Sequence, residues 1–171
     1  MKQLTIFRIL TFILLPIAAM FGFMDLLFLF SALANPALLL IVFILGSFVI
    51  YTFVSLQFLT RGIDTGRVCK PGLRDWIRVN AFVSLFMGIM FLFNALSIFF
   101  TNDINLRQYV SQFMQTQPNI PAMLNVEMFM TIMKGMAYFM FFLSIILLVH
   151  IKLNFRLMKQ YAHLLSEPKP Q

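Results

Sequence analysis

A single carboxylate stands in the most apolar part of this sequence. Asp25 lies within FGFMDLLFLF, residues 21–30, where every other residue is apolar or glycine. An unpaired charge is costly in a bilayer and in a protein core alike. We therefore expect Asp25 to be paired, protonated or in contact with water.

Lys134 is the predicted partner of this carboxylate. If the apolar segments are membrane-spanning helices, then Asp25, Asn94 and Lys134 each fall about 8 Å to the outer side of a span centre, at a rise of about 1.5 Å per residue. We predict an intramembrane ion pair between Asp25 and Lys134, with a hydrogen bond from Asn94. Tyr138 is predicted to line the same polar cluster. An alternative leaves Lys134 at the outer interface with its amine in water, and Asp25 protonated or bound to water.

The side chains needed for other kinds of chemistry are scarce. His150 and His163 are the only histidines, and Cys69 is the only cysteine, so an internal disulfide is excluded. The sequence contains no HExxH, GxSxG, paired-carboxylate or Cys/His metal motif. His150 is predicted to be an interfacial residue rather than a ligand. We therefore expect no cofactor, no metal and no enzymatic activity.

The composition is that of a membrane protein. Of 171 residues, 61% are hydrophobic and 11% are charged, whereas soluble domains carry about 25% charged residues. The net charge is +7, which in a soluble protein would suggest nucleic-acid binding. Here the bases flank apolar segments, so they indicate orientation in a bilayer and no nucleic-acid partner.

Four stretches are long enough to cross a bilayer, which takes about 20 apolar residues. Residues 9–60 are too long for one helix, and Asn35 and Pro36 supply the turn signal between two. The sequence predicts an all-α fold, a polytopic bundle of four transmembrane helices in a single membrane domain, 1–171. The predicted spans are 8–33, 36–60, 76–100 and 127–153.

Lysine and arginine orient these spans. Bases cluster before the first span, in the loop 61–75 and in the tail 154–171, whereas Arg107 is the one base in the loop 101–126. The positive-inside rule therefore predicts that both termini and the loop 61–75 are cytoplasmic. The bases predicted to meet anionic lipid headgroups are Arg61, Arg67, Lys70, Arg74 and Arg78.

Each predicted span also carries a stripe of small or polar residues at helical spacing, the pattern by which helices associate in lipid. The simplest interpretation is that these stripes are the surfaces through which the helices of the bundle pack. The stripes are Ala18, Gly22 and Asp25; Ser47, Tyr51 and Ser55; Asn80, Ser84, Gly88 and Asn94; and Glu127, Thr131, Lys134 and Tyr138.

The outer loop, 101–126, is predicted to contain a short amphipathic helix that Asn105 caps and that Pro118 and Pro121 end. Its apolar face is either a docking surface for a partner or a face lying in the outer headgroup region. The residues of this face are Leu106, Tyr109, Val110, Phe113 and Met114.

These features favour a small non-enzymatic membrane protein, an accessory or structural subunit of a larger membrane complex. The expected partners are the lipid bilayer and other integral membrane subunits, or further copies of the chain. The short loops and the lack of disulfides suggest a bacterial inner membrane. The alternative is a small proton-coupled transporter that uses Asp25 and Lys134 within the bundle.

Overall fold

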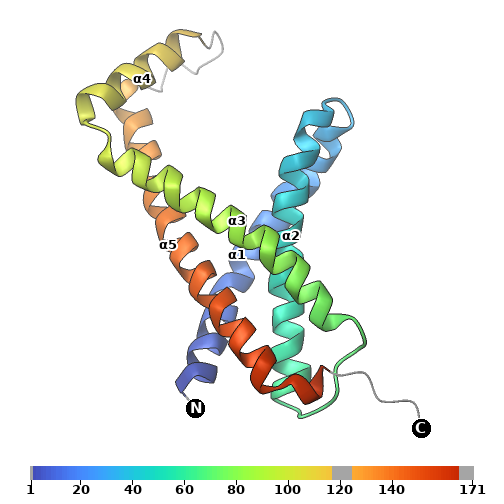
Figure 1. Ribbon diagram of the computed structural model, residues 1–171. Helices are drawn as coiled ribbons and strands as arrows, with labels where there is room; N and C mark the ends of the chain where they lie inside the picture. Colours follow the sequence, from blue (N-terminus) through green and yellow to red (C-terminus); the bar gives the residue numbers. More distant parts are fainter. Residues whose placement is uncertain (1, 117–124, 166–171) are drawn as a thin grey trace. The chain divides into compact units, whose positions relative to one another are not determined.

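The computed structural model is all-helical (Figure 1). The structure describes residues 2–116 and 125–165. The α-helices are α1 (Lys2–Ala32), α2 (Leu39–Gln57), α3 (Leu73–Phe100), α4 (Asp103–Thr116) and α5 (Val126–Gln160). Among the described residues, the 3₁₀ helix η1 (Pro36–Leu38) and the π-helix η2 (Phe58–Ile63) precede and follow α2, and the 3₁₀ helix η3 (Ala162–Leu164) follows α5.

Four helices are long and apolar enough to cross a membrane: α1, the continuous segment Pro36–Ile63, α3 and α5. This confirms the predicted all-α class and the predicted number of long apolar helices. The turn between the first two also follows the sequence signal. Asn35 Oδ1 accepts a hydrogen bond from the backbone N–H of Ala37 at 3.2 Å, and Pro36 opens η1.

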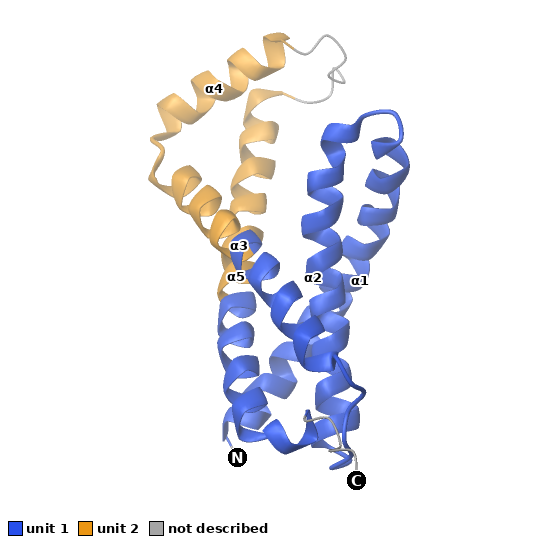
Figure 2. Ribbon diagram, turned by 45° about the vertical axis from the view of Figure 1, so that its right-hand side comes forward, with its two compact units in different colours: residues 1–87, 146–171 blue, residues 88–145 orange. Residues whose placement is uncertain are grey.

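The chain divides into two compact units (Figure 2). Unit 1 comprises residues 1–87 and 146–171, and unit 2 comprises residues 88–145. The sequence predicts one membrane domain, whereas the division cuts α3 and α5 within continuous helices. Both long helices therefore contribute to both units.

In unit 1, α1 and α2 form an antiparallel hairpin whose helices lie side by side in both views (Figures 1 and 2). Small residues let the two backbones approach, as is common between membrane helices. Ala18 is fully buried. A Cβ atom at Gly22 would lie 3.5 Å from Val49, and one at Gly46 would lie 3.2 Å from the carboxylate of Asp25.

Parts of α3 and α5 complete unit 1. The rings of Phe82 and Phe155 lie 6.2 Å apart, and Phe7 of α1 stacks on the ring of His150 at 4.6 Å. The large side chains fully buried in this core include Phe7, Leu14, Phe48, Tyr51, Phe58, Leu59, Ile77, Leu147, His150 and Leu157.

One end of unit 1 is held together by polar contacts among three segments distant in sequence. Arg8, near the start of α1, pairs with Asp64 after η2 at 2.5 Å. The backbone N–H of Cys69 donates to the carbonyl of Leu164 in η3 at 2.8 Å. The start of α1, the loop between η2 and α3, and the end of the described chain therefore meet at the same end.

In unit 2, α4 packs against α5 through a small core of Leu106, Val110 and Met130. Asn102 Oδ1 accepts from the backbone N–H of Ile104 at 3.2 Å, and the helix begins at Asp103. The prediction that Asn105 caps this helix is therefore wrong, because the helix begins before Asn105 and Asn102 caps its second amide, that of Ile104. Pro118 and Pro121, predicted to end it, lie outside the described residues.

Candidate functional site

Asp25 lies in a groove of unit 1 and has no ion pair among the described residues. Its Oδ1 atom is buried without a hydrogen-bond partner, while Oδ2 faces Gly46 on α2. Since a side chain at position 46 would contact this oxygen, the glycine makes room for the carboxylate beside the neighbouring helix. A buried acceptor without a donor is rare in folded proteins and marks a candidate site.

The groove itself has a volume of about 510 Å³ and is lined mainly by apolar side chains. Val42, Phe43 and Ile50 come from α2, and Val79 comes from α3. Its remaining lining residues are Asp25, Gly46, Ser47, Asp75, Trp76 and Asn80. The groove thus contains two carboxylates, and no lysine or arginine lines it among the described residues.

A second group of polar residues in unit 1 lies deep in the core and is centred on His150. The ring nitrogen Nε2 lies 2.9 Å from Thr11 Oγ1, and Nδ1 lies 2.7 Å from the Tyr51 hydroxyl. Asn154 Nδ2 donates to Ser55 Oγ at 2.7 Å and to the Tyr51 oxygen at 3.3 Å. These five side chains, the His150 network, are fully or almost fully buried.

The donors and acceptors of this network fix the tautomer of His150. The Thr11 hydroxyl donates its one proton to the carbonyl of Phe7 at 2.8 Å. Toward His150 it can therefore act only as an acceptor, so Nε2 carries the proton of that hydrogen bond. In a neutral ring, Nδ1 then carries no proton and accepts from the Tyr51 hydroxyl. His150 thus links α1, α2 and α5 through both ring nitrogens, and Asn154 Oδ1 is the one buried side-chain atom of these five residues without a partner.

The prediction for His150 was wrong. It was expected at the membrane interface, but it is fully buried and hydrogen-bonded at both nitrogens. A signal for this position was present in the sequence, since His150 and Asn154 are spaced four apart and share one helix face with the apolar residues Leu147 and Ile151.

The residues of the predicted polar cluster have different contacts in the structure. Lys134 Nζ lies 2.7 Å from Asp103 Oδ1, a partner that the sequence analysis missed. Asn94 is exposed and donates to the carbonyl of Met90 in its own helix at 2.8 Å. Tyr138 is 57% exposed and its ring lies against Phe99. These three residues of unit 2 thus have other partners.

Asp25 belongs to unit 1 and Lys134 to unit 2. The ion pair between them stays a prediction.

The four predicted stripes are buried to different degrees. Ser47, Tyr51 and Ser55 of the second stripe are all buried, as are Asn80 and Ser84 of the third. The fourth stripe was placed on the wrong part of α5. Glu127 and Thr131 are exposed, and the polar residues that α5 buries are Ser144, His150 and Asn154.

The predicted docking face of α4 is only partly available. Leu106 and Val110 are buried against α5, and Met114 packs on the same core. Tyr109 and Phe113 are exposed. The helix thus uses part of its apolar stripe to pack within unit 2, and docking of a partner on this face stays a prediction. A second contact, the ion pair of Arg107 with Glu127, also joins α4 to α5.

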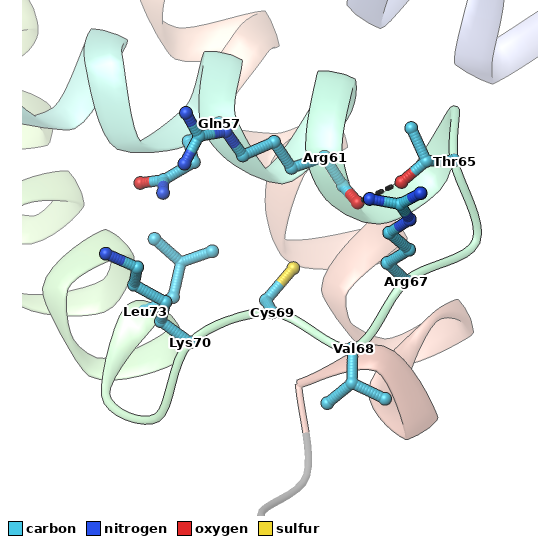
Figure 3. A pocket seen from close by; sticks show the side chains of 8 residues that line it. All are labelled: Gln57, Arg61, Thr65, Arg67, Val68, Cys69, Lys70 and Leu73. Carbon is cyan, nitrogen blue, oxygen red and sulfur yellow. Dashed lines mark hydrogen bonds between the residues drawn. The ribbon is translucent and has the colours of Figure 1, made fainter.

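Three of the five predicted headgroup-binding bases surround a pocket of about 310 Å³ between η2 and the start of α3 (Figure 3). Arg61, Arg67 and Lys70 line it together with Gln57, Thr65 and Cys69, whereas Arg74 and Arg78 do not. We call the pocket lined by Gln57, Arg61, Thr65, Arg67, Cys69 and Lys70 the basic pocket. Burial raises the pKa of the Cys69 thiol, so the thiol is uncharged at neutral pH.

Comparison of the chain with protein-family models, with curated proteins and with solved structures finds no match.

Proposed function

We propose that this chain is an integral membrane protein with four spans and cytoplasmic ends, and that it serves as a non-enzymatic accessory subunit of a larger membrane assembly. Large apolar side chains on its long helices are widely exposed, among them Phe23 at 66%, Phe30 at 70% and Phe93 at 64%. Exposed apolar surface on this scale needs lipid or another protein to cover it. A bacterial inner membrane remains our proposal for the location.

The orientation is supported by the basic end of unit 1. The contacts Arg8–Asp64 and Cys69–Leu164 hold together the segments that carry most of the chain's lysines and arginines. Bases collected at one end are typical of a cytoplasmic end.

The orientation can be tested by labelling single cysteines in intact cells after Cys69→Ser. Val68→Cys should react only once the inner face is exposed, and Thr116→Cys should react from outside. Labelling of both from the same side would refute the four-span arrangement.

The observation that carries the accessory role is the unpartnered carboxylate of Asp25 in its apolar groove. A charged group at membrane depth costs about 2.5–3.5 kcal/mol even on insertion-based scales, and such groups usually pair. The groove offers small residues at Gly46 and Ser47 and apolar walls, the surface against which membrane helices pack. A transmembrane helix of another subunit that carries a lysine or arginine fits this chemistry.

The role is tested by purifying the chain from its own membranes in mild detergent and identifying co-purifying proteins by mass spectrometry. We expect an integral membrane protein at fixed stoichiometry, lost in Asp25→Asn and retained in Glu127→Gln, which removes an exposed carboxylate of unit 2. A chain that migrates alone, or a partner unaffected by Asp25→Asn, would contradict the proposal.

The same groove favours one second candidate, a small proton-coupled carrier in which Asp25 binds and releases the proton. A groove of about 510 Å³ is large enough for a small ligand. Vesicles containing the purified chain alone separate the two functions. Substrate-dependent proton uptake that Asp25→Asn abolishes would support the carrier, and its absence together with a stoichiometric partner would support the subunit.

A further inference from the structure

We propose that the basic pocket is a specific site for a phosphate group, carried by an anionic lipid headgroup or by a free phosphate compound. The sequence predicts diffuse attraction of five loop bases to anionic lipid. The structure divides these bases, because only Arg61, Arg67 and Lys70 line one pocket, which Figure 3 shows around the Cys69 thiol.

The described residues that line the pocket give it a positive charge. Among the described residues, none of these three bases forms an ion pair with a carboxylate. The one acidic residue between Arg61 and Lys70 is Asp64, and it is paired with Arg8 at 2.5 Å. Three cationic side chains therefore line the pocket, and among the described residues no carboxylate lines it.

The donors suit phosphate in particular. Arginine offers a planar set of N–H groups that matches phosphate oxygens, and lysine adds a compact charge. Gln57 contributes an amide N–H₂ group at the same pocket. The hydroxyl of Thr65 donates to the carbonyl of Arg61 at 2.5 Å (Figure 3), so this acceptor at the end of the helix, which would repel an anion, is already occupied.

The walls of the pocket are held in place before any ligand binds. Gly62 makes room for the loop, since a Cβ atom there would lie 2.8 Å from Cys69 Sγ. The Cys69 N–H bonds to Leu164 at 2.8 Å. Gly66 and Gly72 take positive φ angles of 65° and 81°, which let the loop turn on either side. The π-helix η2 forms one wall, and π-turns often occur at functional sites.

Arg74 and Arg78 supply a matched control, because they are exposed bases just beyond the pocket and carry the same charge. We compare R61Q/R67Q with R74Q/R78Q in the full-length chain. Binding of short-chain phosphatidic acid to the detergent-solubilised protein is measured by native mass spectrometry at fixed salt. Short-chain phosphatidylcholine, whose phosphate is neutralised by its own ammonium group, serves as the control lipid.

A specific site predicts that phosphatidic acid binds more tightly than phosphatidylcholine. It also predicts that R61Q/R67Q weakens this binding tenfold or more, as expected for loss of charge-assisted hydrogen bonds, while R74Q/R78Q weakens it less than about threefold. Equal losses in the two double variants, or no preference over phosphatidylcholine, would overturn the proposal. Displacement of the lipid by millimolar inorganic phosphate would identify a free phosphate compound as the ligand, and lipid binding that resists it would identify a headgroup.

Discussion

Unit 1 places polar side chains in apolar surroundings twice, and the two places differ in how their atoms are satisfied. In the His150 network, five side chains from α1, α2 and α5 bond to one another, and one amide oxygen is left over. In the groove, Oδ1 of the Asp25 carboxylate has no hydrogen-bond partner, and Oδ2 faces Gly46, which has no side chain to donate a hydrogen bond.

The difference separates a structural role from a binding role. A satisfied network links three helices in one arrangement, so its loss should lower the stability of the isolated chain. An unpartnered carboxylate contributes nothing favourable to that chain, and its value lies in what it can bind. The stability of the isolated chain is measured in detergent, where no partner is present.

The largest effect is expected for His150→Ala. The change removes a fully buried ring that stacks on Phe7, and the Tyr51 and Thr11 hydroxyls each lose their hydrogen bond to it. We expect a loss of about 3 kcal/mol in the free energy of unfolding, followed by denaturant titration with circular dichroism. The exposed His163→Ala should change it by less than about 0.5 kcal/mol. Equal effects of the two variants would mean that the network does not hold the helices.

Tyr51→Phe should have a smaller effect, because it removes one hydroxyl and keeps the ring. The lost oxygen bridges His150 and Asn154, and we expect a loss of about 1–2 kcal/mol by the same titration. Tyr138→Phe is the matched control, since that ring is 57% exposed. A loss in Tyr138→Phe as large as that in Tyr51→Phe would break the distinction between buried and exposed hydroxyls.

Asp25→Asn should leave the isolated chain as stable as before or raise its stability by up to about 1 kcal/mol. No ion pair is broken, and the cost of keeping a charge out of water disappears. The sign of this change is the sharpest contrast with the His150 network. A loss of more than about 1 kcal/mol would show that Asp25 has a stabilising partner within its own chain.

The smallest effect concerns Lys134, which pairs with Asp103 at an exposed site. A double-mutant cycle of Lys134→Met with Asp103→Asn should give a coupling of about 0.2–1 kcal/mol, the usual size for exposed ion pairs. A cycle of Lys134→Met with Asp25→Asn tests the ion pair between those two residues directly. Coupling of several kcal/mol in the second cycle would instead establish the ion pair that the sequence suggested.

Much of the fold could be predicted from the sequence, because length and hydropathy are local properties. The long apolar helices follow from them, and the turn at Asn35 and Pro36 follows from local backbone chemistry. The residues of the second stripe, Ser47, Tyr51 and Ser55, share one face of a mostly apolar helix, and all three are buried.

The site could be predicted only in part, since burial depends on which helices meet. Asn94 looked like a seam residue, but an asparagine in a helix can satisfy itself on the carbonyl four residues earlier, as it does at Met90. Lys134 found its partner in Asp103 of the loop helix, which a comparison restricted to the spans could not reveal. The network at His150 joins residues up to 139 positions apart, and no local pattern fixes that register.

The most direct test of the central claim is photocrosslinking from the groove in native membranes. A photoreactive phenylalanine analogue at Val79, which is 62% exposed and lines the groove, is compared with one at Phe12, which is exposed on α1 away from it. We predict one discrete adduct with another membrane protein from position 79, lost when Asp25→Asn is added, and none from position 12. The same adducts from both positions, or an adduct from position 79 that persists without the carboxylate, would contradict the account.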